Sequence, residues 1–230
     1  AFATSSGQKF EVLLDGLFRA QFDCDALREA GERAELDLTD PLGGEMENIR
    51  VTLVFPSHSV GVLDYVELDD GATVVPHKFD TKMLFIGDSI TQGWQAMIDT
   101  YSYAYRVSSF FNAESVIQGI GGAYFNENSF DSLPFDPDTV IVAYGTNDFG
   151  HGTIPLGDMD SRDIHTFYGG LHTLCTFLIN TYKDKPIIFM TPLHRLNEVL
   201  DHNNRLKEGN TNARPLIDFV RAEREVCEFY

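Results

Sequence analysis

The sequence predicts an α/β domain with a parallel sheet over residues 80–230, preceded by a small antiparallel β-sandwich domain over residues 1–79. Short segments in which apolar and polar side chains alternate fill the N-terminal part, as in half-buried strands. After residue 80, short and nearly unbroken apolar runs alternate with longer stretches that can form helices, which is typical of parallel strands covered on both faces. A chain of 230 residues can hold one large domain or two smaller ones.

Strands are expected in the N-terminal domain wherever the alternation is regular. The clearest case is 49–55, where Ile49, Val51, Leu53 and Phe55 share one face. Four further segments have similar lengths and turn-rich borders: 9–14, 17–23, 33–38 and 62–68. Short strands at this spacing predict an antiparallel sandwich.

The α/β domain is expected to contain four buried strands and three long helices. The apolar runs that predict the strands are 83–86, 115–117, 139–143 and 186–190. The stretches that predict the helices are 100–111, 162–182 and 213–229. In open parallel sheets, ligands bind at the carboxyl ends of the strands, so the residues that follow each apolar run are the candidates for chemistry.

A serine follows the first of these strands directly after a glycine turn. In that position the Ser89 hydroxyl faces solvent and can act as a nucleophile if a base lies within hydrogen-bond reach. The alternative is that Ser89 only caps a helix. Asp88 beside it is expected to orient this turn, because its side chain points away from that of Ser89.

Two further strand ends carry groups that suit acyl transfer. The backbone N–H groups of Ser89 and Gly122 and the side-chain amide of Asn147 are candidate donors to the oxyanion of a tetrahedral intermediate. Glycine at 122 allows close approach of the backbone, and asparagine at 147 supplies a neutral donor. The alternatives are a flexible turn at Gly122 and a helix cap at Asn147.

Three segments resemble the sequence blocks of one enzyme family. Gly-Asp-Ser-Ile-Thr around Ser89, Gly-Ile-Gly-Gly ending at Gly122 and Gly-Thr-Asn-Asp around Asn147 resemble blocks I, II and III of the SGNH (GDSL-like) hydrolases. The resemblance covers about residues 82–195. It implies a flavodoxin-like three-layer α/β/α sandwich and ester hydrolysis through an acyl-serine, without a cofactor, with an oxyanion hole formed by Ser89, Gly122 and Asn147.

The N-terminal segment is similar to the jelly-roll-like domain of some carbohydrate esterases in this family. That similarity implies a small ester substrate, such as an acetylated sugar. A non-catalytic carbohydrate-binding or scaffold protein that retains the fold is the alternative. A phosphate-binding protein is disfavoured, because the chain has no complete G-x-G-x-x-G and no G-x-x-x-x-G-K-[ST].

The fourth block of the family, an Asp-x-x-His that supplies the catalytic base, is not found near Tyr230. We therefore expect that the α/β domain is truncated at its C-terminus. Candidate pocket residues near the predicted strand ends are His151, His194, Trp94 and Tyr124, together with Asp88.

Composition excludes several other classes. The chain has 17 Lys and Arg against 35 Asp and Glu, a net charge of −18, which argues against nucleic acid and anionic membranes as partners. No apolar run reaches the ~20 residues that span a bilayer. The three cysteines have neither disulfide nor zinc spacing, so no metal is expected. They predict buried thiols and a cytoplasmic location; a secreted chain whose leader has been removed is the alternative.

Overall fold

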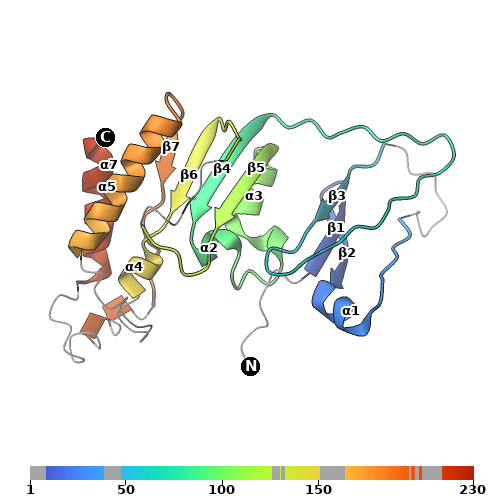
Figure 1. Cartoon of the computed structure of the whole chain (residues 1–230), viewed down its shortest axis with the longest axis horizontal. Coiled ribbons are helices and arrows are strands. Elements are labelled where there is room, and N and C mark those ends of the chain that lie inside the picture. The colour runs from blue at the N-terminus through green and yellow to red at the C-terminus, as the bar shows by residue number, and fades with distance from the viewer. Residues whose placement is uncertain are drawn as a thin grey trace. The chain divides into compact units, whose positions relative to one another are not determined.

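The computed structural model describes residues 9–38, 48–125, 130, 133–150, 164–196, 198–199, 202–203 and 214–230. The chain divides into two compact units. The first unit comprises Ala1–Phe79 and Gly93–Ser109, and the second comprises Asp80–Gln92 and Phe110–Tyr230. Each unit has its own sheet (Figure 1). Residues 93–109 therefore cluster with the first unit, although the sequence assigned them to the α/β domain.

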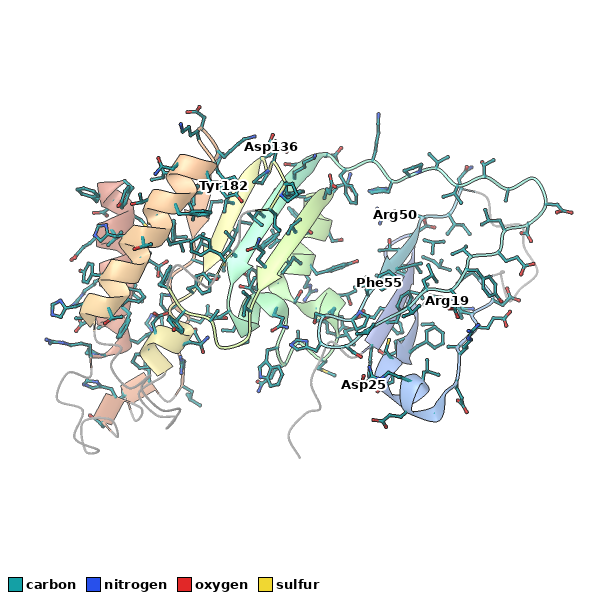
Figure 2. All side chains as sticks on the ribbon, in the orientation of Figure 1. Arg19, Asp25, Arg50, Phe55, Asp136 and Tyr182 are labelled. Atoms are coloured by element: carbon teal, nitrogen blue, oxygen red, sulfur yellow. The ribbon has the colours of Figure 1, made fainter. Side chains whose placement is uncertain are left out.

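The first unit is built on a three-stranded antiparallel sheet in the order β2-β1-β3. Its strands are β1 (Lys9–Leu14), β2 (Leu17–Asp23) and β3 (Val51–Val54). Asp15 and Gly16 form the hairpin turn between β1 and β2 with φ angles of 49° and 80°, the conformation that favours Asp-Gly in two-residue hairpins. The backbone N–H of Arg50, labelled beside β3 in Figure 2, donates to Asp15 Oδ1 at 2.9 Å and ties β3 to this turn.

The predicted small N-terminal β domain is present, but two of its predicted strands are wrong. Segments 33–38 and 62–68 form no strand where they are described, and no second sheet layer is seen among the described residues of this unit. A jelly-roll topology is therefore not confirmed. A helix that the sequence analysis missed, α1 (Cys24–Ala30), follows β2 directly.

The second unit contains the predicted parallel sheet. Its strands are β4 (Thr81–Gly87), β5 (Ala113–Gly119), β6 (Thr139–Ala143) and β7 (Ile187–Phe189), and their order is β5-β4-β6-β7. All three pairings are parallel. Each strand lies on one of the four predicted apolar runs, so the predicted α/β class is confirmed.

Two long helices, α5 (Ile164–Thr181) and α7 (Leu216–Phe229), pack on one face of this sheet (Figure 1). Their apolar side chains form one buried cluster with those of β4 and β6; its members include Leu84, Ile86, Val140, Val142, Leu171, Leu174, Leu178, Phe219 and Val226. Full burial of each large apolar side chain contributes about 1.5–3 kcal/mol, so this layer is the main source of stability in the unit.

Shorter helices complete the described structure. The 3-10 helix η1 (Asp99–Tyr101) and most of α3 (Tyr103–Phe110) belong to the first unit. In the second unit, α2 (Ser89–Gln92) follows β4, and α4 (Thr146–Gly150) follows β6. No helix in the described ranges combines the length and hydropathy needed to cross a bilayer.

The cysteine prediction needs a correction. All three cysteines are free, but only Cys175 is buried, whereas Cys24 and Cys227 are partly exposed. Cys24 begins a helix on the surface of the first unit, and Cys227 lies near the C-terminal end of α7.

Candidate active site

The ends of three adjacent strands lie in one row. Gly87, the last residue of β4, is in register with Gly119 at the end of β5 and with Ala143 at the end of β6. Because the three strands are parallel, the segments that follow them emerge at the same edge of the sheet, where Figure 1 shows α2 and α4. The structure thus brings the segments of Ser89, Gly122 and Asn147 to one edge.

The turn after β4 leaves no room for a side chain at Gly87. A Cβ there would lie 2.0 Å from Thr91 Oγ1 and 2.6 Å from the carbonyl oxygen of Ala143. Glycine therefore lets β4 run straight into α2 while Thr91 of α2 and the carbonyl of Ala143 at the end of β6 both lie close to the turn. This close approach fixes where the first residue of α2, Ser89, leaves the sheet.

The side chain of Asp88 is hydrogen-bonded to the backbone of this turn. Its side chain is buried, and Oδ1 accepts a hydrogen bond of 2.8 Å from the backbone N–H of Ile90. Burial raises the pKa of Asp88, and the Ile90 N–H and the Arg195 charge act against that rise. These contacts suit a residue that orients the turn.

Ser89 is half-buried. Among the described residues, none is hydrogen-bonded to its hydroxyl. The hydroxyl is therefore not used as a helix cap within the described structure, which leaves it available to a substrate or a base.

The segment after β5 is fixed against α2. A Cβ at Gly119 would lie 2.2 Å from the backbone nitrogen of Gln92, and the N–H of Ile120 donates to the carbonyl oxygen of Gly87 at 3.0 Å. Gly122 follows with φ +78°, a conformation that side chains rarely adopt. It is exposed, and nothing lies within 4 Å of where its Cβ would be. A substrate atom can therefore approach this part of the backbone.

Asn147 connects the segments after β5 and β6. Its side-chain Nδ2 donates to the carbonyl oxygen of Ala123 at 2.7 Å. A primary amide has two N–H groups, so one remains to serve as a donor at this edge. Gly145, just before α4, has φ +99°, and a Cβ there would lie 2.3 Å from Pro192 Cγ.

Two buried polar residues, one in α4 and one just before it, were not assigned a role from the sequence. Asp148 is buried, and its Oδ2 accepts a hydrogen bond of 3.4 Å from the N–H of Phe125. Burial, with a smaller contribution from the Asp88 charge, raises the pKa of Asp148 to about 7. Burial also raises the pKa of Tyr144. The polar sequence Asn147-Asp148 gave no sign that the aspartate points into the core.

Arg195 is a further residue whose position the sequence did not reveal. Its guanidinium donates to the carbonyl oxygen of Thr146 and lies 5.1 Å above the ring of Phe149. It therefore ties the segment after β7 to α4. The one sequence feature that could have indicated a role for Arg195 was its position after the fourth apolar run.

The structure describes three of the four remaining candidate pocket residues. His194 has a side chain that is 69% exposed, and its Nδ1 lies 3.1 Å from Glu198 Oε2. Tyr124 is half-buried just after the Gly122 turn. Trp94 belongs to the first unit, where its ring contacts that of His58. His151 lies outside the described residues.

Within the described ranges, no group of three or more His, Cys, Asp and Glu side chains could hold a metal ion. The segments that follow the aligned strand ends carry a serine, a glycine backbone and an asparagine amide, which suit acyl transfer.

Residues 85–226 match the GDSL-like lipase/acylhydrolase family. The chain belongs to this family, also called the SGNH hydrolases, and is thus an esterase or acylhydrolase acting on carboxylic esters. A comparison with curated proteins found no match.

Several solved structures are similar to this chain. An acetylxylan esterase from Geobacillus stearothermophilus is 21% identical, with a TM-score of 0.46, and the match covers 66% of this chain and 73% of that one. A catalytic mutant of that esterase is 20% identical, with a TM-score of 0.47, over 66% and 74% of the two chains. A protein described as a GDSL-like lipase, from Parabacteroides merdae, is 18% identical, with a TM-score of 0.49, over 66% and 75%.

Proposed function

We propose that this protein is a serine esterase that hydrolyses small acyl esters of sugars, chiefly acetyl esters, through an acyl-serine intermediate. The observation that supports the proposal is the common register of three strand ends, because the segments that carry Ser89, Gly122 and Asn147 follow these ends at one edge of the sheet. Acyl transfer requires a nucleophile and oxyanion donors close together, and these three segments carry both kinds of group.

The proposed reaction begins with attack of Ser89 Oγ on the ester carbonyl while a base takes the hydroxyl proton. The carbonyl oxygen becomes an oxyanion, which accepts hydrogen bonds from the N–H groups of Ser89 and Gly122 and from the second N–H of Asn147. The C–O bond to the alcohol breaks, the alcohol leaves with a proton, and water then releases the acyl group from Ser89.

The base is the part of this mechanism that the described residues do not supply directly. His194 has a carboxylate partner on Nδ1, which is how a catalytic imidazole is commonly oriented, but none of its hydrogen bonds in the described structure reaches Ser89. His151, the other candidate, lies outside the described residues. Both histidines are therefore targets for substitution.

A neutral sugar is the alcohol that fits the charge of the chain. The net charge of −18 repels anionic substrates such as phospholipids or nucleic acids, whereas a sugar ester carries no charge.

Hydrolysis of p-nitrophenyl acetate tests the proposal. We expect release of p-nitrophenol by the wild-type protein, and Ser89→Ala should lower kcat by at least about 10³-fold. Circular dichroism of both proteins controls for folding. Equal rates for the two proteins would overturn the proposal and favour a non-catalytic, carbohydrate-binding protein that retains the fold.

A further inference from the structure

A short segment of the first unit exposes three large apolar side chains. Trp94 is 49% exposed, Met97 71% and Tyr101 56%. Single exposed apolar residues are common, but several within one short segment suggest a binding surface. Trp94 is the single tryptophan of the chain.

The backbone that carries Trp94 is in an unfavourable conformation. Gln95 and Met97 have φ angles of 64° and 68°, which cost free energy for residues other than glycine. Gly93 precedes them with φ +99°. Strained residues of this kind persist only where surrounding contacts enforce them, and they occur often at ligand sites.

The buried carboxylate of Glu11 in β1 fixes the position of residues 99–100, which follow Trp94 and Met97 in the sequence. Glu11 is fully buried, and its Oε1 accepts a hydrogen bond of 2.9 Å from the N–H of Asp99. Its Oε2 accepts one of 2.6 Å from Thr100 Oγ1. Burial of a carboxylate is costly. Here the hydrogen bonds that offset the cost also hold residues 99–100 on the sheet.

A second chain of contacts leads from Asp99 to Trp94. Asp99 accepts hydrogen bonds from the backbone N–H of Ser57 at 3.0 Å and from its hydroxyl at 2.6 Å. Because the hydroxyl proton points to Asp99, Ser57 Oγ accepts from Nδ1–H of His58, 2.8 Å away. The His58 ring contacts the indole of Trp94, with centroids 5.6 Å apart and ring planes tilted by 54°. The Trp94 ring is thus in contact with an imidazole that is itself held by a hydrogen bond.

We propose that Trp94, supported by His58, is a binding platform for a neutral sugar ring. A sugar ring has an apolar C–H face, which suits an exposed indole, and polar hydroxyls at its edge. The nearby carboxylates of Glu11 and Asp99 disfavour an anionic ligand. The platform lies in the first unit and needs no ester chemistry, although the choice of a sugar rests on the proposed function.

The rigidity of the support matters for affinity. A binding group that is already held in place loses little conformational freedom when the ligand binds. Glu11 and Asp99 are positioning residues on this account, because they act through the backbone of residues 93–101 and not by touching the sugar.

Fluorescence of the intact chain tests the platform, since all tryptophan emission comes from Trp94. Titration with xylohexaose, which carries no acyl group, should give a saturable change in intensity and a blue shift. Xylitol, which has hydroxyls but no ring, should give neither. The proposal would be overturned by no change with xylohexaose or by an equal change with xylitol. It would also be overturned if only hexyl acetate, an ester without a sugar ring, changed the emission.

Calorimetry separates binding from the optical signal. Trp94→Ala should weaken xylohexaose binding at least about tenfold, the loss of about 1.4 kcal/mol, whereas Trp94→Phe should retain part of the affinity. Tyr65→Ala removes another exposed aromatic side chain of the same unit and should leave the affinity unchanged. Equal affinities of Trp94→Ala and wild type, with both folded by circular dichroism, would overturn the proposal.

The two proposals can fail separately. Sugar binding by a protein that does not hydrolyse p-nitrophenyl acetate would leave the platform standing and overturn the esterase. Hydrolysis that depends on Ser89, without a response of Trp94 to xylohexaose, would overturn the platform alone.

Discussion

The side-chain amide of Asn147 donates a hydrogen bond of 2.7 Å to the carbonyl oxygen of Ala123. A carbonyl can only accept, so this contact fixes which end of the amide faces Ala123. The segments that follow β5 and β6 are thereby joined through one side chain. The orientation also determines where the second N–H of Asn147 points.

Substitution of Asn147 should impair catalysis more than substrate binding. Asn147→Ala removes one proposed oxyanion donor, so kcat for p-nitrophenyl acetate should fall by about 10²–10³ while KM changes little. Asn147→Asp keeps the size but places a negative charge next to the Ala123 carbonyl and the oxyanion, so its loss should be at least as large. A kcat near that of wild type for either variant would contradict the assignment.

Two neighbouring glycines in α5 provide a matched test of the core. A Cβ at Gly170 would lie 1.9 Å from the carbonyl oxygen of Phe125, whereas nothing lies within 4 Å of a Cβ at Gly169. Gly169→Ala should raise the free energy of unfolding by up to about 1 kcal/mol through helix propensity. Gly170→Ala should lower it by about 1–3 kcal/mol through overpacking. Urea unfolding measures both, and similar effects of the two substitutions would contradict the packing of α5 on Phe125.

A buried glutamate in α7 should make stability depend on pH. Both carboxylate oxygens of Glu223 are buried and have no hydrogen-bond partner among the described residues. Burial, followed by the charges of Cys227 and Asp148, raises the pKa of Glu223 from 4.5 to about 9. The folded state therefore holds this proton more tightly than the unfolded state does. Its contribution to stability is fully present below the unfolded pKa and is lost as the pH rises toward 9.

Glu223→Gln removes this titration while keeping the shape of the side chain. Between the two pKa values, wild-type stability should fall relative to the variant by up to about 1.4 kcal/mol per pH unit. Urea unfolding at several pH values in this window measures the difference. Parallel pH profiles for the two proteins would show that Glu223 ionises freely in the folded state.

Substitution of His194 should have a small effect on hydrolysis. Its side chain is 69% exposed, and its hydrogen bond on Nδ1 goes to Glu198. A general base must come within hydrogen-bond reach of the nucleophile, and no such contact with Ser89 exists among the described residues. His194→Ala should therefore keep kcat within about tenfold of wild type, far above Ser89→Ala. A loss as large as that of Ser89→Ala would make His194 the base.

The sequence predicted the second unit better than the first, for a physical reason. Strands buried on both faces leave continuous apolar runs, and β6 was predicted at its observed bounds. Segment 62–68 is rich in apolar residues, but a strand also needs a neighbour to pair with, and Val62 and Tyr65 remain exposed. The sequence of this segment therefore indicated that it could form a strand, but not whether a neighbouring strand would pair with it.

The missed helix α1 did have local signals. Asp23 accepts a hydrogen bond from the N–H of Ala26 as its N-cap, and Gly31 ends it in the left-handed conformation. No local sequence signal indicated that residues 93–109 cluster with the first unit. This clustering depends on hydrogen bonds such as those between Glu11 and residues 99–100, which join positions far apart in the chain.

The edge occupied by Ser89, Gly122 and Asn147 was predictable in outline, because glycines and polar residues follow successive apolar runs. The contacts that set its geometry were not predictable from those residues alone. The hydrogen bond from Asn147 to Ala123 and the burial of Asp148 both depend on how α4 sits on the turn after β5.

Identification of the acylated residue tests the central claim most directly. The intact protein would be mixed with p-nitrophenyl acetate, quenched in acid at short times and analysed by peptide mass spectrometry. We predict one acetyl group on the peptide that contains Ser89, located on that serine and lacking in Ser89→Ala. An acetyl group on another residue, or the same labelling in Ser89→Ala, would contradict the assignment of Ser89 as the nucleophile.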